Sequence, residues 1–581
     1  MEVGQILLKR GLLDARQLEI VRNAQTNGQR LDEVAVQLGF VSEEQALRAL
    51  ADEVGLEYVD LADTDIDLSL LRTFPQRYIH REMLFPVRQR NGTLVVATCD
   101  PFNLYPLDEL SSATGLTVVP VLASRAEISR LIKTHLGVGS ETIEGLLAQV
   151  DDERIELLQE IEDDGSELSE MAKEPSVIRL VNEILLEAIQ TRASDVHIEP
   201  QQSGLMIRYR IDGVLHPQPV PPEISRFQNA IISRLKIMSR LNIAERRLPQ
   251  DGRIELKVAG REVDVRVSVI PMIHGEGVVL RLLDKGGMDF NLRNLGMEED
   301  LLETFRELIQ LPHGIILVTG PTGSGKSTTL YSSLLEIRSG QTKIITTEDP
   351  VEYQLEGINQ IQVHPKIGLT FGTTLRHILR HDPDIILVGE IRDLETAENA
   401  IQAALTGHLV FSTLHTNDAA GAYTRLIDMG VEPFLVSSTV EAVMAQRLVR
   451  TLCKHCKQPY VPKPDEVPRD FPIDQVSADR PIYKAVGCRE CRGVGYLGRV
   501  GIFELLVTTE RIRQLAHDRA TSWNIAQAAL EEGMRTLRND GWLKVLSGRT
   551  TIEEVARVTK ANVLTMAGQR ALTKQLGRQQ I

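Results

Sequence analysis

Several kinds of residue are scarce in this chain of 581 residues, and each scarcity excludes a class of protein. The five cysteines are too few for the disulfide scaffold of a secreted protein. The longest apolar runs, such as 315–318 and 385–388, are far shorter than the roughly 20 residues of a membrane-spanning helix. The N-terminus lacks the basic stretch and apolar run of a secretory signal. We therefore expect a cytoplasmic protein whose contact with a membrane is peripheral.

Positive charge is also in short supply. The 65 Lys and Arg residues stand against 80 Asp and Glu residues, giving a net charge of −15, and no run of basic residues is present. Because a protein that binds the nucleic-acid backbone needs clustered Lys and Arg, we expect no nucleic-acid partner. The 42% of hydrophobic residues is ordinary for a folded protein, and the length is too great for one core. Several domains are therefore expected.

The N-terminal 55 residues carry an imperfect repeat with an offset of 28 residues. Gly11 and Gly39 would each end a helix in the left-handed conformation. Asp14 and Gln17, matched by Ser42 and Gln45, have the spacing of a capping box that opens the next helix. The repeat predicts two helical hairpins. After them, the runs 84–87 and 93–98 around an Asn-Gly pair predict a β-hairpin in a small α/β unit.

A charged segment separates this front end from the rest of the chain. Between Asp151 and Glu174 stand 11 acidic residues and two basic ones, which supply −9 of the net charge. Such a segment repels itself, so it is interpreted as a solvated tether rather than an acidic recognition tail. Beyond it, helical and strand patterns alternate as far as residue 285. From Leu311 to Leu452, buried-strand runs alternate with helices, which predicts a parallel sheet covered on both faces.

A phosphate-binding loop stands at the start of this last region. An apolar strand at 314–319 runs into Gly-Pro-Thr-Gly-Ser-Gly-Lys-Ser and then a helix. Glycines let backbone N–H groups wrap phosphates at a helix N-terminus, Lys326 would reach the β- and γ-phosphates, and Ser327 would ligate Mg²⁺. The predicted nucleotide-binding residues are Gly320, Pro321, Thr322, Gly323, Ser324, Gly325, Lys326, Ser327 and Thr328.

Two carboxylates follow predicted strands downstream. Glu348 ends one strand and Glu390 follows another, where parallel sheets bind their ligands. Gly389 stands where the usual pattern has an Asp that binds the metal. We therefore expect Glu390 to bind the metal and Glu348 to orient the attacking water. The alternative role for Glu348 or Glu390 is to cap the N-terminus of the helix that follows it. His408 and His415 flank a third strand, and each is either a hydrogen-bonded packing residue or a sensor of the γ-phosphate. His415 is the candidate site residue.

Four segments resemble the secretion ATPase family: Gly320 to Thr328, Ile345 to Glu352, Asp382 to Asp393 and Thr406 to Asn417. In that family they are the Walker A loop, Asp box, Walker B segment and His box. The resemblance extends over about residues 175–560. It implies an ATP-hydrolysing homo-hexamer for type II secretion or type IV pilus assembly, using ATP and Mg²⁺. Its implied partners are an inner-membrane platform protein and a membrane-anchored docking protein.

The resemblance also implies a PAS-like domain that supplies arginines to the nucleotide phosphates. Arg210, Arg266 and Arg281 are the candidates in this chain, with an ordinary salt bridge as the alternative role for each. Such arginines would neutralise charge as the γ-phosphoryl group leaves.

Cys453 and Cys456, with Cys488 and Cys491, form two Cys-x-x-Cys pairs. Four thiolates at this spacing predict a closed, structural Zn²⁺ site, with reduced thiols or disulfides as the alternatives. The insertion resembles the tetracysteine element of the assembly branch of the family, which its retraction motors usually lack.

The front end resembles the N-terminal domain of the same ATPases, which in some members binds cyclic di-GMP through paired motifs beginning Arg-Leu-Gly. Here the copies begin Glu2-Val3-Gly4 and Arg30-Leu31-Asp32, and one closing Gln is replaced by Glu53. One guanine-stacking Arg is lost and carboxylates are added near the phosphates, which disfavours cyclic di-GMP. A docking domain for an inner-membrane partner is expected instead.

The fold class expected from these patterns is multidomain α/β with a RecA-like P-loop core. Its expected parts are an N-terminal domain at 1–140, an acidic linker at 141–174, a PAS-like domain at 175–290, the RecA-like domain at 291–452, the tetracysteine element at 453–505 and a C-terminal helical region at 506–581. A DNA-translocating motor and a nucleotide-gated adaptor without hydrolysis are the competing functions.

Overall fold

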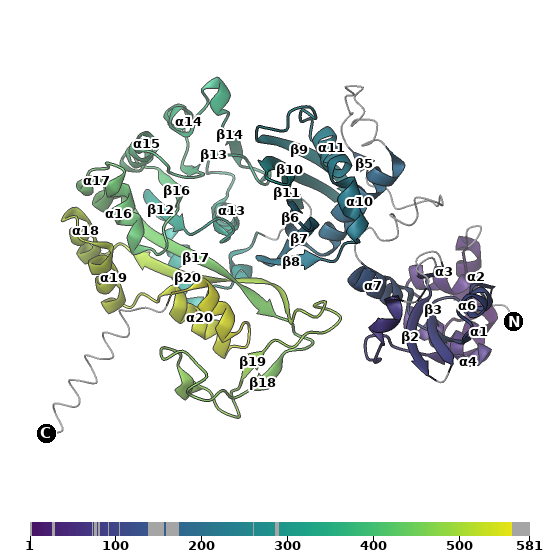
Figure 1. The fold of residues 1–581 in the computed structure, drawn as a ribbon. Helices are drawn as coiled ribbons and strands as arrows, with labels where there is room; N and C mark the ends of the chain where they lie inside the picture. Colours follow the sequence, from purple (N-terminus) through teal and green to yellow (C-terminus); the bar gives the residue numbers. More distant parts are fainter. Residues whose placement is uncertain are drawn as a thin grey trace. The chain divides into compact units, whose positions relative to one another are not determined.

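The computed structural model describes residues 3–25, 29–72, 74, 78–79, 82–90, 92–103, 105–136, 156–157, 174–258, 261–284 and 290–560 (Figure 1). Two compact units, Met1–Asp284 and Lys285–Ile581, make up the chain. Within the described ranges no helix has the length and apolar character needed to cross a membrane. Most of the expected acidic linker and residues 561–581 of the expected C-terminal region lie outside the described residues.

The front end begins with two helical hairpins, as the repeat predicts. The helices are α1 (Val3–Lys9), α2 (Ala15–Ala24), α3 (Leu31–Gln37) and α4 (Glu43–Val54). Both predicted capping boxes form: Asp14 with Gln17 opens α2, and Ser42 with Gln45 opens α4. The left-handed backbone of the glycine before each box explains why the repeat needs glycine there.

A four-stranded sheet follows in the order β1-β4-β3-β2. Its elements are β1 (Glu57–Tyr58), η1 (Leu68–Arg72), β2 (Phe85–Arg90), β3 (Thr93–Thr98), α6 (Tyr105–Thr114), β4 (Thr117–Leu122) and α7 (Arg125–Leu136). Strands β2 and β3 pair antiparallel, which confirms the hairpin, although Asn91 of its predicted turn is outside the described residues. Leu122 at the end of β4 packs with Ile6 and Leu50 of the helices, so the hairpins and the sheet share a core.

The second domain is an antiparallel sheet with helices on one face. Its elements are β5 (Glu156–Leu157), α10 (Pro175–Gln190), β6 (Ala193–Gln201), β7 (Gly204–Ile211), β8 (Val214–Gln218), η2 (Pro222–Phe227), α11 (Gln228–Met238), β9 (Gln250–Val258), β10 (Arg261–Met272) and β11 (Gly275–Asp284). The strand order is β5-β9-β10-β11-β6-β7-β8. Strand β5 lies inside the expected linker, so residues 156–157 are not tether but pair with β9.

The third domain is a seven-stranded sheet in the order β14-β13-β15-β16-β12-β17-β20. Its elements up to β17 are η3 (Leu292–Leu295), α12 (Glu299–Leu308), β12 (Gly314–Thr319), α13 (Lys326–Ile337), β13 (Ile344–Glu348), β14 (Asn359–Gln362), η4 (Pro365–Ile367), α14 (Phe371–Ile378), β15 (Ile385–Val388), α15 (Leu394–Leu405), β16 (Leu409–Leu414), α16 (Ala420–Asp428), α17 (Pro433–Thr439) and β17 (Val440–Leu452). The six strands from β14 to β17 in this order are parallel.

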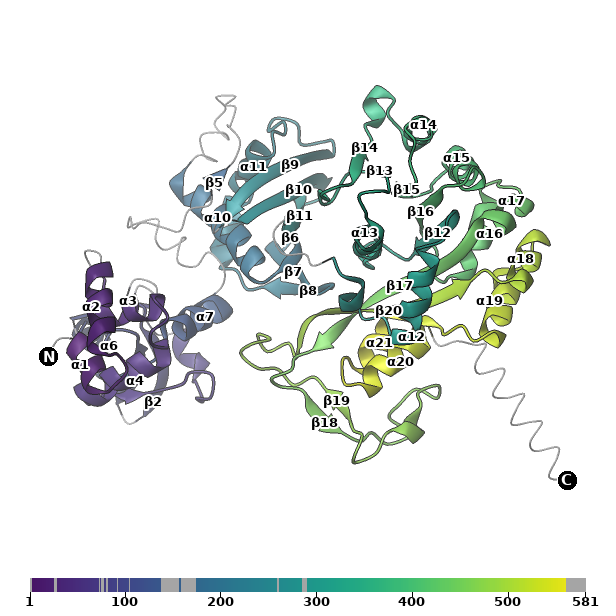
Figure 2. The same cartoon turned by 180° about the vertical axis from the view of Figure 1, so that it is seen from behind.

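Helices cover both faces of this sheet, as the buried-strand runs predict (Figures 1 and 2). Successive side chains of β12 point to opposite faces: Ile315 packs in the core with α15 and α16, while Ile316 packs in the core with α12 and α13. A strand buried on both faces has a nearly continuous apolar sequence, and all six residues of β12 are buried.

The sheet continues after the cysteine-bearing segment. The remaining elements are β18 (Gln458–Tyr460), η5 (Ile473–Gln475), β19 (Ile482–Lys484), β20 (Tyr496–Val507), α18 (Glu510–His517), α19 (Ser522–Glu531), α20 (Leu537–Leu546) and α21 (Ile552–Val558). Strand β20 pairs antiparallel with β17, so it belongs to the RecA-like sheet rather than to the tetracysteine element. The element expected at 453–505 is therefore shorter and occupies 453–495, between two neighbouring strands.

Candidate nucleotide and metal sites

The predicted strand, loop and helix of the phosphate-binding loop are all present. Strand β12 ends at Thr319 and α13 begins at Lys326, with Gly325 in the left-handed conformation as its N-cap. A Cβ at Gly320 would lie 2.6 Å from the Gln446 carbonyl oxygen, and its φ of +150° is unfavourable for other residues. Only glycine fits here, because β17 passes directly beside the loop.

Lys326 lies over this loop. Its Nζ donates hydrogen bonds to the carbonyl oxygens of Gly320, at 2.8 Å, and Pro321, at 3.1 Å. Burial lowers the pKa of Lys326, Glu390 opposes that shift, and the positive charge of Arg447 adds to it. The Ser324 hydroxyl is buried and has no hydrogen-bond partner among the described residues. An ammonium group and an unsatisfied hydroxyl on a glycine-rich loop fit a phosphate ligand.

Glu390 and His415 come together at the ends of neighbouring strands. His415 Nε2 lies 3.2 Å from Oε2 of Glu390, and Arg392 forms an ion pair with the other carboxylate oxygen. The structure also explains the departure at Gly389. A Cβ there would lie 3.1 Å from the Thr347 carbonyl oxygen and 3.3 Å from the Cα of Glu348, so a side chain at this position would crowd the backbone of β13.

Glu348 is buried at the end of β13, with 5% of its surface exposed. Three side chains donate hydrogen bonds to its carboxylate: Tyr331 to Oε2, Thr346 to Oε1 at 2.6 Å, and Gln360 to Oε1 at 3.0 Å. Neither Glu348 nor Glu390 caps a helix; Asp393 caps α15 instead. His408 Nδ1 lies 2.8 Å from the Ala403 carbonyl oxygen, a contact that fits the hydrogen-bonded packing role.

The three candidate arginines lie in one row across the sheet of the second domain. The antiparallel register sets one residue from each of five neighbouring strands opposite the next. From β9 through β10, β11 and β6 to β7, these residues are Arg253, Arg266, Arg281, Asp195 and Arg210. Residues directly opposite one another share a face. Their neighbours Val265 and Val267 pack in the core with α10 and α11, so the row stands on the face that these helices leave open.

Asp195 holds two members of this arginine row. Its carboxylate lies 3.1 Å from Arg281 Nε and 3.7 Å from Arg210 Nε. The side chains of Arg210 and Arg281 are 35% and 48% exposed, so their guanidinium groups remain accessible to a ligand. Sequence reasoning identified the arginines but not the carboxylate that orients them.

Two residues beside the nucleotide loop were missed from the sequence. Arg447 on β17 donates to the carbonyl oxygens of Gln446, at 2.9 Å, and Asn417, at 2.8 Å, and burial lowers its pKa. Tyr331 on α13 contacts Glu348. The only available signal for Arg447 was its place in a largely apolar stretch of sequence, which does not reveal that β17 borders the loop.

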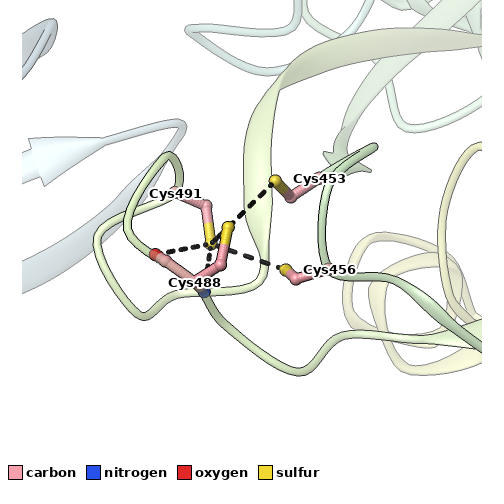
Figure 3. Close-up of side chains that lie close together, drawn as sticks. All are labelled: Cys453, Cys456, Cys488 and Cys491. Atoms are coloured by element: carbon pink, nitrogen blue, oxygen red, sulfur yellow. Dashed lines mark hydrogen bonds between the residues drawn. The ribbon is translucent and has the colours of Figure 1, made fainter. Parts of the chain in front are cut away.

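The four predicted zinc ligands converge from two loops (Figure 3). Three pairs of sulfur atoms lie 3.7 Å apart: Cys453 with Cys488, Cys456 with Cys491, and Cys488 with Cys491. All four lie within 4.8 Å of one another. Sulfurs held about 2.3 Å from one tetrahedral ion are roughly 3.8 Å apart. The donor set and its geometry therefore fit Zn²⁺.

Backbone N–H groups support these thiols. Those of Cys488 and Gly495 each donate to Cys491 Sγ at 3.1 Å, and that of Gly487 donates to Cys456 Sγ at 3.3 Å. Burial opposes the Cys491 thiolate, but the N–H groups, together with hydrogen bonds from the Cys456 and Cys488 thiols, outweigh it and lower the pKa of Cys491. None of the five cysteines forms a disulfide in the described part of the chain.

Comparison with known proteins decides the family. The model of the type II/IV secretion system protein family matches residues 170–557, more than half of the chain. The chain belongs to this family. The type IV pilus assembly ATPase PilB of Myxococcus xanthus is 42% identical over 95% of this chain and 98% of its own length. Type II secretion system protein E of Xanthomonas campestris pv. campestris is 46% identical over 96% of this chain and 98% of its own length. Type II secretion system protein E of Pseudomonas aeruginosa is 52% identical over 68% of this chain and 78% of its own length.

Family membership confirms the resemblance read from the four nucleotide-site segments, and with it the expected multidomain α/β fold class. A second model, the MshEN domain, matches residues 54–142. That match covers the four-stranded sheet and its helices, as the resemblance of the front end predicts.

Arg30, which begins the second Arg-Leu motif of the front end, contacts other side chains of the same domain. Arg30 lies 2.6 Å from Asp32 and 2.8 Å from Asp100, and its guanidinium stands over the Phe102 ring. Glu53 forms an ion pair with Lys9 at 3.3 Å. Glu2 of the first motif lies outside the described residues. The two carboxylates occupy in-plane N–H groups of Arg30, and the Phe102 ring covers one face of its guanidinium, the kind of surface on which a guanine base would stack.

Proposed function

We propose that the chain is a Mg²⁺-dependent ATPase that drives type II secretion or type IV pilus assembly as a hexamer at the cytoplasmic face of an inner-membrane platform. One observation carries this proposal: the phosphate-binding loop, Glu348, Glu390 and His415 meet at the carboxyl edge of one parallel sheet. The near full-length identity to assembly and secretion ATPases supports the same conclusion.

Each residue of this edge has a part in hydrolysis. Lys326 and the loop N–H groups would bind the β- and γ-phosphates, and Ser327 with Glu390 would hold Mg²⁺. The metal, when bound, neutralises charge that develops on the phosphate oxygens. Glu348 orients the attacking water, and His415 senses, through Glu390, whether the γ-phosphate is present.

The arginine row supplies the remaining positive charge. Arg210, Arg266 and Arg281 would neutralise the leaving phosphoryl group, with Asp195 fixing the direction of two of them. Since these arginines and the phosphate-binding loop belong to different domains, closure of the domains around ATP would couple hydrolysis to movement. A hexameric ring would pass that movement to the platform protein.

The other two regions have supporting roles. Zn²⁺ bound by the four cysteines would hold the short element between β17 and β20 in shape. The N-terminal domain would dock onto the membrane-anchored partner. Cyclic di-GMP is the less favoured ligand of this domain, because the carboxylates of Asp32 and Asp100 lie beside Arg30 and would repel its phosphates.

Phosphate release by the purified protein tests the proposal. We expect release from ATP that requires Mg²⁺, stops with a chelator and is unchanged by double-stranded DNA. Stimulation by DNA would favour a translocating motor instead. Stoichiometric ATP binding with no phosphate release, in any oligomeric state, would favour a nucleotide-gated adaptor.

A genetic experiment separates the two transport roles. The chain would be deleted from its source cell and replaced by the wild type or by Lys326→Ala. Loss of surface pili that only the wild type restores would assign pilus assembly. Loss of secreted proteins with pili intact would assign type II secretion.

A further inference from the structure

The carboxylate of Glu348 is almost fully supplied with hydrogen-bond donors. A carboxylate has about four acceptor positions, two on each oxygen. Thr346 and Gln360 occupy two positions on Oε1, and Tyr331 occupies one on Oε2. With the donors that the described part of the chain supplies, one position is left, on the oxygen that Tyr331 binds. The Tyr331 hydroxyl therefore determines where the remaining lone pair of Glu348 points.

Tyr331 itself is held firmly in place. Its ring makes edge contacts with Phe290, at a centroid distance of 5.6 Å, and with Tyr353, at 6.4 Å. The ring is buried, with 1% of the residue exposed. Burial first, and then the Glu348 carboxylate, raise the pKa of Tyr331, so the hydroxyl stays protonated and donates. A rotamer fixed by packing lets one hydroxyl position its partner accurately.

The place of Tyr331 in the chain connects the two ends of the site. Tyr331 lies on α13, five residues after Lys326, which begins this helix. Glu348 lies on β13, so the hydrogen bond joins the phosphate-binding helix to the strand that carries the water-orienting group. A shift of α13 in response to the phosphates would therefore reach Glu348 directly.

We propose that Tyr331 is a positioning residue for hydrolysis, whose hydroxyl fixes the Glu348 carboxylate so that the remaining lone pair of Oε2 holds the attacking water. This inference rests on the proposed function, in which Glu348 orients that water. Tyr331 acts through Glu348 and does not itself contact the substrate.

Tyr331→Phe removes the hydroxyl and keeps the ring. The matched control is Tyr423→Phe, which also removes one buried tyrosine hydrogen bond, of 2.7 Å to Thr508, in the same unit. We expect Tyr331→Phe to lower kcat about tenfold or more, because hydrogen bonds to charged groups are the stronger ones, with KM for ATP changed less than about twofold. Tyr423→Phe should leave kcat unchanged. Thermal unfolding of both variants shows any common loss of stability.

A double variant separates positioning from structure. In single-turnover assays, Tyr331→Phe should add no further loss to Glu348→Gln, because the carboxylate that it positions is gone. Wild-type kcat in Tyr331→Phe, or an equal loss in both backgrounds, would overturn the inference. Full turnover by Glu348→Gln alongside an inactive Lys326→Ala would overturn it and remove Glu348 from the mechanism, while ATP hydrolysis at the phosphate-binding loop would stand. No turnover by the wild type would contradict the proposed function itself.

Discussion

The imidazole of His415 lies 3.2 Å from the carboxylate of Glu390, which joins the end of β16 to the end of β15. The strands pair in parallel, so residues that follow them meet at one edge of the sheet. Arg392 occupies the other oxygen of Glu390. Because Glu390 is proposed to hold Mg²⁺, His415 is placed to respond to what that carboxylate binds.

We expect His415→Asn to lower kcat about tenfold while nucleotide affinity changes little, since a hydrogen bond to a charged group near the reacting atoms is lost. Steady-state ATP hydrolysis and nucleotide titration measure the two quantities. His408→Asn is the control, because His408 contacts the Ala403 carbonyl at the end of α15. It should lower the melting temperature and spare kcat. Equal kcat values for the two variants would remove His415 from the mechanism.

Asp195→Asn should lower kcat several-fold, because Arg281 and Arg210 lose the carboxylate that orients them. The matched variant is Glu199→Gln on the same strand, where an ion pair of 2.7 Å with Arg208 is lost. We expect near wild-type turnover from Glu199→Gln. If both variants lose activity equally, the arginine row has only a structural role.

Metal analysis of the purified protein should find about one Zn²⁺ per chain, bound by four thiolates. Cys456→Ser should lose most of this zinc and lower the melting temperature by several degrees, since the element between β17 and β20 has little core of its own. Cys99→Ser, outside the cluster, should keep the metal. Retention of zinc by Cys456→Ser would contradict the assignment.

The buried carboxyl group of Glu504 should make the free energy of unfolding depend on pH. Burial raises the pKa of Glu504 to about 7, helped by Asp418 and opposed by Arg447 and by N–H groups of Ala419 and Leu537. Between the usual Glu pKa of about 4.5 and about 7, the unfolded chain releases this proton while the folded chain keeps it. Stability is therefore lost as pH rises through this range, by up to about 3 kcal/mol.

Thermal unfolding of the wild type and Glu504→Gln between pH 5 and 8 checks this prediction. The wild type should lose stability relative to the variant as pH rises to about 7, and the difference should then level off. A constant difference across the range would show that Glu504 titrates alike in both states.

The sequence predicted those features that depend on local spacing. The strand, glycine loop and helix around Lys326, and both capping boxes, were expected correctly because neighbouring residues determine them. Features that depend on which strands distant in the sequence become neighbours were missed. Asp195 reaches Arg281 from 86 positions away, and β20 joins β17 across the cysteine-bearing segment. Arg447 borders the loop only because β17 is the neighbour of β12.

The most direct test of the account is ATP turnover by the wild type, Lys326→Ala and Glu390→Gln, with the oligomeric state measured in the same samples. The account predicts slow Mg²⁺-dependent turnover that rises as hexamers form and disappears in both variants, because each removes a group that contacts the phosphates or the metal. Turnover that persists in Lys326→Ala, or that is independent of assembly, would contradict it.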